Sequence, residues 1–259
     1  MTILAGIDTS AILTAPRSVQ EQALEALMEL DRRESQKRFF HLFPDETHAW
    51  RGDTFHCRAA YAPHIEFLTA TAQYTECAFM AGNRTGKTET GAFALSVWLT
   101  GNYPDWWPGR RFDGPVAVWA AGKTNETTRD ILQAKLLGNV TYVDSEKTMD
   151  GTGVLPGSHI DKVTWRQGVA DLADVVRIRH VSGEWSELGF KSYQQGRGSF
   201  EGTARHVVWL DEEPPQDVYT ECLTRTATTN GLIIATFTPL DGLTDVAMSF
   251  MPDDMRPGK

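Results

Sequence analysis

A glycine-rich loop that follows a short apolar run constrains the fold more than any other feature of this chain. Residues 77–90 read CAFMAGNRTGKTET, in which Ala81 replaces the first glycine of the GxxxxGK[ST] phosphate-loop pattern. Gly82 and Gly86 permit backbone angles that other residues rarely adopt, so successive N–H groups can line a nest for phosphate oxygens. The pattern therefore predicts a strand, a phosphate loop, and a helix over 88–100 whose N-terminus faces the phosphate.

The side chains of this loop have separate roles in the pattern. We expect Lys87 to reach the β- and γ-phosphates of a nucleotide, and the Thr88 hydroxyl to bind Mg²⁺. The residues expected to surround the phosphates are Gly82, Asn83, Arg84, Thr85, Gly86, Lys87 and Thr88. A strand-to-helix turn that contains the same letters without holding a phosphate is the alternative.

The chain around the loop alternates between buried-type strands and helices. Continuous apolar runs are typical of strands that are covered on both faces. The predicted elements are strands at 77–81, 116–121, 207–210 and 232–237, helices at 125–138 (capped by Asn125) and 217–226, and a hairpin of 174–181 with 185–193. This alternation indicates an α/β fold with a mostly parallel sheet flanked by helices.

The N-terminal part precedes this core. Residues 17–40 carry apolar side chains three and four positions apart, which predicts an amphipathic helix packed on the core. Residues 41–63, with two prolines and a glycine, are typical of a connector. Residues 138–162 are glycine-rich, and we expect them to be irregular.

Carboxylates come directly after the apolar run at 207–210, in the stretch VVWLDEE. Because ligands bind outside the carboxyl ends of parallel strands, we expect Asp211 and Glu212 at the same sheet edge as the phosphate loop. Asp211 suits Mg²⁺ binding, and Glu212 suits orienting or deprotonating a water that attacks the γ-phosphate. Glu213 is then a spare acid, solvated or paired. An acidic cap on the following helix is the alternative reading.

Composition limits the classes of partner. The 259 residues carry a net charge of -9, which argues against a simple basic DNA-binding module. The three cysteines are far apart, which favours reduced thiols in a cytosolic protein. Apolar runs fall short of membrane-spanning length, so we expect no membrane partner.

The chain resembles the ATPase domain of the large terminase subunit of tailed bacteriophages, the motor that packages DNA into the procapsid. The resemblance spans roughly residues 61–250. It rests on the segments FMAGNRTGKT, GNYPDWWPGRRF, AGKTNETTRDILQAKLLG, FKSYQQGR, VVWLDEEP, LTRT and ATFTPLDG. It implies a P-loop NTPase fold of the ASCE class, with an extra strand between the lysine strand and the Asp-Glu strand.

The resemblance also implies roles for residues outside the phosphate loop. Thr236 and Thr238, in TFTPLDG, would sense the γ-phosphate and relay its loss. An arginine would contact the nucleotide: Arg84 from the same subunit, Arg129 from a neighbouring one, or Arg197 as a weaker third candidate. For Arg129, a surface ion pair is the equal alternative.

Recognition of the base is the point at which this chain departs from the family. Relatives carry a glutamine that reads the adenine edge, and the matching place in YAPHIEF is His64. A histidine cannot make the two-point contact of an amide, so adenine selectivity is open. Tyr61 is expected to stack on the base instead.

The resemblance predicts an organisation and a function for the chain. Residues 1–60 would be an N-terminal helical or lid segment, 61–250 the ATPase core, and 251–259 the start of a linker, with no nuclease activity from this chain. The function would be Mg²⁺-dependent ATP hydrolysis coupled to translocation of double-stranded DNA. The portal, the small terminase subunit and a ring of identical subunits would be partners in the host cytoplasm.

Two other functions remain open from the residues alone. One is another P-loop enzyme, a helicase-like translocase or a phosphotransferase, and the other is a nucleotide-binding scaffold that does not hydrolyse. A local basic patch for DNA is plausible between residues 177 and 205, although a solvated hairpin is at least as plausible. Its cations are Arg177, Arg179, Lys191, Arg197 and Arg205.

Overall fold

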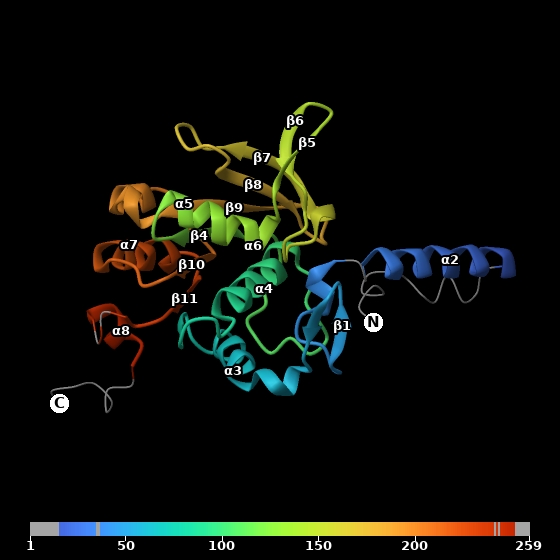
Figure 1. Cartoon of the computed structure of the whole chain (residues 1–259), viewed down its shortest axis with the longest axis horizontal. Coiled ribbons are helices and arrows are strands. Elements are labelled where there is room, and N and C mark those ends of the chain that lie inside the picture. The colour runs from blue at the N-terminus through green and yellow to red at the C-terminus, as the bar shows by residue number, and fades with distance from the viewer. Residues whose placement is uncertain (1–15, 35–36, 241, 243, 252–259) are drawn as a thin grey trace.

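A seven-stranded sheet forms the centre of the protein, as the computed structural model shows (Figure 1). The structure describes residues 16–34, 37–240, 242 and 244–251. In spatial order the strands are β3 (Glu76–Met80), β11 (Leu232–Phe237), β10 (Val207–Asp211), β4 (Ala117–Gly122), β9 (Trp185–Ser192), β8 (Ala173–Arg179) and β7 (Ile160–Trp165). The predicted α/β class is thus confirmed.

The strand directions bring the functional segments to one edge. Strands β3, β11, β10, β4 and β9 run parallel, whereas β8 and β7 continue the sheet antiparallel. Strand β11 lies between β3 and β10, so the extra strand implied by the resemblance is present. The phosphate loop after β3 and the acids at the end of β10 therefore meet at the carboxyl edge.

Helices cover both faces of the sheet. One core joins α4 (Lys87–Thr100) to β3, β10 and β8 through side chains such as Phe93, Trp98 and Leu99. The other core joins α7 (Gln216–Ala227) and α8 (Asp245–Ser249) to the opposite face through Val218 and Cys222. Alternate residues of β10 point into the two cores, as the period of a strand requires. The predicted strands 207–210 and 232–237 are buried on both sides.

The helix expected at 125–138 forms in three pieces. It consists of α5 (Asn125–Thr127), the π-helical η3 (Thr128–Gln133) and α6 (Ala134–Leu137). Thr124, not the predicted Asn125, is the N-cap, because its Oγ1 accepts the backbone N–H of Thr127 at 3.1 Å. The Asn125 side chain accepts a hydrogen bond from Ser192 instead, which ties the helix start to the end of β9.

The N-terminal predictions need correction. Helix α2 (Arg17–Glu34) forms, but it ends before residue 40 and projects from the body of the molecule (Figure 1). Val19, expected to pack on the core, is 46% exposed. The expected connector at 41–63 contains further structure, namely η1 (Arg38–His41), β1 (His48–Trp50), β2 (Asp53–Phe55), η2 (Arg58–Tyr61) and the start of α3 (Ala62–Ala70).

The glycine-rich stretch 138–162 is also more regular than predicted. It contains the hairpin of β5 (Val140–Val143) and β6 (Glu146–Met149), then η4 (Gly157–His159) and the start of β7. The predicted hairpin of β8 and β9 is confirmed, with Arg179 opposite Trp185. Two short 3-10 segments follow β9, η5 (Tyr193–Gln195) and η6 (Arg197–Phe200). In the described part of the chain, no helix has the length and hydropathy to cross a bilayer.

Candidate functional site

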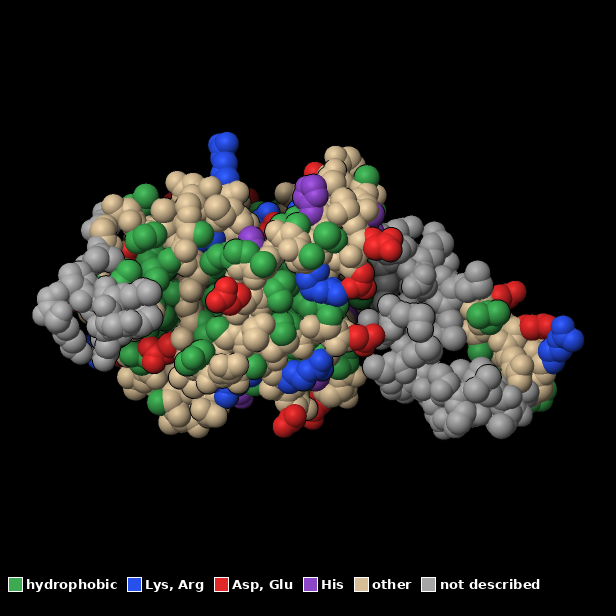
Figure 2. Space-filling model, turned by 90° about the horizontal axis from the view of Figure 1, so that it is seen from below, with side chains coloured by type: hydrophobic (Ala, Val, Ile, Leu, Met, Phe, Trp, Pro, Cys, Tyr) green, Lys and Arg blue, Asp and Glu red, His purple; other side chains and the backbone are tan. Residues whose placement is uncertain are grey.

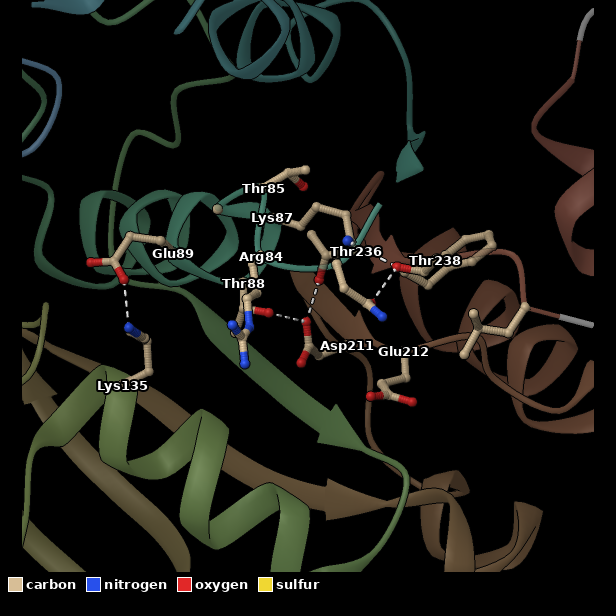
Figure 3. Close-up of a pocket in the computed structure, with 14 residues that line it drawn as sticks. Arg84, Thr85, Lys87, Thr88, Glu89, Lys135, Asp211, Glu212, Thr236 and Thr238 are labelled. Atoms are coloured by element: carbon tan, nitrogen blue, oxygen red, sulfur yellow. Dashed lines mark hydrogen bonds and ion pairs between the residues drawn. The ribbon is translucent and has the colours of Figure 1, made fainter. Parts of the chain in front are cut away.

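A pocket of about 300 Å³ opens at the carboxyl edge of the sheet, between the phosphate loop (residues 81–88) and the ends of β10 and β11. Figure 3 shows the loop side chains and the acids of β10 facing the same space. The lining residues are Asn83, Arg84, Thr85, Gly86, Lys87, Thr88, Glu89, Lys135, Asp211, Glu212, Thr236, Phe237, Thr238 and Leu240. The structure thus brings together most of the residues predicted from the sequence.

The phosphate loop is held open around the Lys87 ammonium group. Gly86 has φ 87°, a left-handed angle that glycine adopts without strain, and it precedes the first residue of α4. Lys87 Nζ donates to the carbonyl oxygens of Ala81 (2.8 Å) and Gly82 (2.6 Å) and to Thr238 Oγ1 (3.1 Å). All three ammonium hydrogens are therefore directed before any phosphate arrives.

The charge state of Lys87 depends on both burial and its neighbours. Burial lowers the pKa of Lys87, while the carboxylates of Asp211 and Glu212 act to raise it. A phosphate in the pocket would add negative charge and favour the ammonium form further. The lysine is therefore suited to bind an anion at this position.

Asp211 is the centre of a hydrogen-bond network on the side of the pocket formed by Thr88 and Thr236. Its Oδ1 accepts from Thr88 Oγ1 at 3.0 Å and from Thr236 Oγ1 at 2.6 Å (Figure 3). Burial raises the pKa of Asp211 to about 6, against the two hydroxyl donors, which lower it. The acid is only 6% exposed.

The donor set fits Mg²⁺. Hydroxyl and carboxylate oxygens are hard ligands of the kind that Mg²⁺ prefers, together with phosphate oxygens. Thr88 donates its hydrogen to Asp211, so its oxygen lone pairs stay available to a cation. Within the described residues, no group of three His, Cys, Asp or Glu side chains could hold a metal ion.

Glu212 differs from Asp211 in its backbone conformation, because its φ angle is positive. It has φ 68°, which is uncommon outside glycine and is typical of functional positions. Its N–H donates to the Thr236 carbonyl at 3.0 Å, and the Tyr193 hydroxyl lies 3.0 and 2.9 Å from the carbonyl oxygens of Asp211 and Glu212. These contacts hold the turn, so the Glu212 side chain is directed into the pocket (Figure 3).

The alternative reading of the acids as a helix cap does not describe this arrangement. Helix α7 has Pro215 at its N-cap and no side-chain cap. Asp211 is occupied by Thr88 and Thr236, and Glu213, the spare acid, accepts a hydrogen bond from Thr244.

Thr238 links the end of β11 to the phosphate loop. Its Oγ1 lies 2.9 Å from the Ala81 carbonyl oxygen and 3.0 Å from Asn83 Oδ1, in addition to accepting from Lys87. Thr236, two residues earlier, contacts Asp211. The two threonines therefore contact the two halves of the pocket from one strand.

A second pocket of about 330 Å³ adjoins the first and shares Gly86 and Glu89 with it. Tyr61 and His64, the candidates for base binding, line this second pocket with residues of η1 and β2. His64 Nε2 lies 2.7 Å from the Thr85 carbonyl oxygen, so this ring nitrogen is already engaged by the phosphate loop. The His64 Nδ1 atom is buried and has no hydrogen-bond partner among the described residues.

The sequence reasoning missed an ion-pair bridge between the two pockets. Glu89 accepts from Arg38 Nε at 2.9 Å, and Lys135 Nζ lies 2.6 Å from its other oxygen. The bridge joins η1, α4 and α6, and Figure 3 shows Glu89 and Lys135 at one end of the pocket. The only sequence signal was the Glu that follows GKT, which is a common exposed residue in a first helical turn.

The three candidate arginines lie in different surroundings. Arg84 lines the pocket, has φ 60°, and makes no ion pair among the described residues. Arg129 is paired with Asp130 at 2.7 Å and donates to the Ala170 carbonyl, and it lines neither pocket. Arg197 is paired with Glu221 at 3.0 Å, also away from both pockets. Only Arg84 reaches the pocket of its own chain.

The suggested basic patch is mostly neutralised within the fold. Arg177 pairs with Asp161, Arg205 pairs with Glu187, and Lys191 and Arg205 both lie over the Trp119 ring. Figure 2 shows a different face, the underside of the view in Figure 1, where basic side chains stand singly among acidic and apolar ones. Arg177 and Arg205 are therefore paired with carboxylates, and a DNA-binding role for this segment stays a prediction.

Comparison with known proteins identifies the family. The family model described as "Terminase large subunit, T4likevirus-type, N-terminal" matches residues 78–257, more than half of the chain. The terminase large subunit of Salmonella phage P22 is 36% identical over an alignment of 220 residues, and the match covers 78% of this chain and 43% of that protein. The chain thus spans less than half the length of this relative.

Solved structures give a weaker likeness. The large terminase ATPase domain of Thermus phage P74-26 has 16% identity and a TM-score of 0.44, covering 66% of this chain and 62% of that one. A large terminase from a thermophilic bacteriophage has 13% identity and a TM-score of 0.45, covering 68% and 38%. The family model covers the segments that form the phosphate loop and the facing Asp211-Glu212 pair. The chain therefore belongs to the family of large terminase subunits of bacteriophages.

Proposed function

We propose that this chain is an ATP-hydrolysing motor domain that couples Mg²⁺-dependent hydrolysis to translocation of double-stranded DNA into a procapsid. One observation carries the proposal: Lys87 and Glu212 line the same pocket, beside the hydrogen bond from Thr88 to Asp211. Membership of the large terminase family supports the same conclusion.

Each residue of the pocket has a proposed role. The N–H groups and side chains of residues 82–88 bind the phosphates, and Lys87 exchanges a loop carbonyl for a phosphate oxygen. Thr88 and Asp211 would hold Mg²⁺, which when bound would neutralise charge on the phosphates. Glu212 orients water and accepts its proton, and its position in the lining of the pocket suits this role. Tyr61 and His64 line the region proposed for the base.

Coupling would run through β11. Thr236 contacts Asp211 and Thr238 contacts Ala81, Asn83 and Lys87, so one strand touches both sides of the nucleotide region. Loss of the γ-phosphate would release Lys87 to these partners, and the strand would transmit the change. We propose that residues 61–250 are the motor core and that residues 1–60 are a lid segment, of which η1 and β2 line the second pocket.

The proposed partners follow from the family. They are double-stranded DNA, the portal, the small terminase subunit and further copies of this chain in a ring, in the host cytoplasm. Residues 252–259, expected to begin a linker, lie outside the described part of the chain.

The test measures ATP turnover with Mg²⁺, with and without double-stranded DNA. We expect Lys87→Ala to weaken ATP binding, and Glu212→Gln to bind ATP normally while turnover falls at least about a hundredfold. Glu213→Gln is the matched control, because this neighbouring acid contacts Thr244 instead of the pocket. Wild-type turnover in Glu212→Gln would refute the proposal, and the transfer of phosphate to an acceptor other than water would indicate a phosphotransferase.

A further inference from the structure

A buried tryptophan lies behind the magnesium side of the pocket. Trp209 on β10 is 0% exposed, and its indole Nε1–H donates to Thr236 Oγ1 at 2.7 Å. Thr236, 2% exposed, donates in turn to Asp211 Oδ1 at 2.6 Å. The three side chains form a continuous hydrogen-bonded chain between two neighbouring strands.

The direction of this chain is fixed by its chemistry. An indole N–H only donates, and a threonine hydroxyl has one hydrogen and two lone pairs. Because Trp209 occupies a lone pair of Thr236, the hydroxyl is held with its single hydrogen on the carboxylate of Asp211. Without the indole donor, the hydroxyl could rotate and donate elsewhere.

The backbone places these groups together. Asp211 pairs with Thr236 in the parallel register of β10 and β11, and Trp209, two residues earlier, points to the same face. A Cβ on Gly91 of α4 would lie 2.6 Å from the indole ring, so only glycine lets the helix rest on it. The helix that begins at Lys87 is thereby packed directly on Trp209.

We propose that Trp209 is a positioning residue for the magnesium site: its indole N–H orients Thr236, which holds Asp211 in the rotamer that accepts from Thr88. A phenylalanine would fill the same apolar space in the strand, so packing alone does not require the N–H. The inference rests on the proposed function, because it assigns Trp209 to the metal side of that same site.

The experiment compares two buried tryptophans whose indole N–H groups both donate a hydrogen bond, one beside the pocket and one outside it. Trp98 is also 0% exposed and donates its indole N–H, to the Arg110 carbonyl at 2.8 Å, but it lies outside the pocket. Calorimetry would measure binding of a non-hydrolysable ATP analogue with Mg²⁺ and with EDTA, and a thermal melt would record stability. Trp209→Phe should reduce the gain in affinity that Mg²⁺ provides by about tenfold. Trp98→Phe should lower the thermal stability about as much as Trp209→Phe does, but it should leave the gain in affinity from Mg²⁺ unchanged.

A second variant should disturb the hydrogen bond from Trp209 to Thr236 while the indole stays in place of a phenyl ring. Gly91→Ala places a methyl group 2.7 Å from the indole Nε1, so we expect it to displace the N–H donor and to reduce the Mg²⁺-dependent gain as Trp209→Phe does. In the double variant with Thr236→Val, Trp209→Phe should add no further loss, because both act through one hydroxyl. Thr236→Ser, which keeps the hydroxyl, should retain the gain.

The outcomes separate the inference from the proposed function. A wild-type Mg²⁺ dependence in Trp209→Phe or in Gly91→Ala would overturn the inference, and so would an equal loss in Trp98→Phe. If the wild-type protein bound no nucleotide with Mg²⁺, the proposed function would fail, and the inference with it.

Discussion

At the scale of single residues, Asp211 shows how a site can oppose the stability of its own fold. The acid is 6% exposed and burial raises its pKa to about 6, compared with 3.8 for an ordinary aspartate. An acid whose pKa is higher in the folded than in the unfolded state destabilises the fold when it ionises. The stability of the protein free of metal and nucleotide should therefore fall as the pH rises from about 4 to about 6, and stay low above that.

Replacing Asp211 by asparagine removes this ionisation and keeps an oxygen for Thr88 and Thr236. We expect Asp211→Asn to be more stable than wild type at pH 7.5 by on the order of 2 kcal/mol, with a smaller difference at pH 5. Thermal melts in EDTA at the two pH values measure this. A variant less stable than wild type at pH 7.5 would contradict the argument, and Asp217→Asn, on the exposed first turn of α7, is the control.

The residues proposed to bind phosphate and metal could be predicted from the sequence, whereas the residues proposed to position them could not. Lys87, Thr88, Asp211 and Glu212 occur in local patterns whose chemistry requires those residue types. Trp209 and Tyr193 act on partners 27 and 18 or more residues away in sequence. In the sequence they look like ordinary apolar positions of a strand and its end, because only the sheet register brings them to the site.

At the scale of elements, one carboxylate joins three segments around the pockets. Glu89 on α4 contacts Arg38 of η1 and Lys135 of α6. Burial raises the pKa of Glu89, but Lys135 and Arg38 outweigh it, so the pKa is lowered overall. The bridge should therefore stabilise the fold above the ordinary pKa of glutamate and lose its effect as the pH falls below it.

Lys135→Gln tests the strength of this bridge. It leaves Glu89, whose side chain is 20% exposed, with one cation, and should lower the free energy of unfolding at pH 7 by about 1–2 kcal/mol. Urea unfolding at pH 7 and pH 4 measures the loss, which should shrink at the lower pH. Arg17→Gln is the control, since its 3.2 Å pair with Glu21 joins two far more exposed side chains and should contribute less. Equal losses of unfolding free energy in the two variants would show that the bridge at Glu89 stabilises the fold no more than an exposed ion pair does.

The elements that the sequence predicted are those with long or strongly apolar patterns. Strands β3, β10 and β11 and helices α4 and α7 lie within one or two residues of expectation. The β1–β2 and β5–β6 hairpins were missed because their strands have only three or four residues, too few for a clear alternating pattern. Helix α3 was missed because Pro63, at the start of a helix where proline is tolerated, was read as part of a connector.

At the scale of the whole molecule, the pocket at the sheet edge contains one of the candidate arginines of its own chain and not the others. Arg84 is in the pocket, while Arg129 lies outside it and is held by Asp130 and the Ala170 carbonyl. Such an arginine contacts a nucleotide only if it belongs to a neighbouring copy in a head-to-tail ring. The position of Arg129 therefore makes its role a question about assembly, and mixing of subunits answers it.

Subunits with Arg129→Ala retain Glu212, and subunits with Glu212→Gln retain Arg129. In a mixed ring with one site at each head-to-tail interface, about a quarter of the sites would combine an intact Glu212 with an intact Arg129 from the neighbour. We therefore expect an equal mixture to recover ATP turnover well above either variant alone, with light scattering to verify assembly. Arg84→Ala mixed with Glu212→Gln is the control, because both residues serve the pocket of their own chain and no mixed site is complete. Assembly without recovery would show that Arg129 is only a surface ion pair and would leave Arg84 as the arginine of the site.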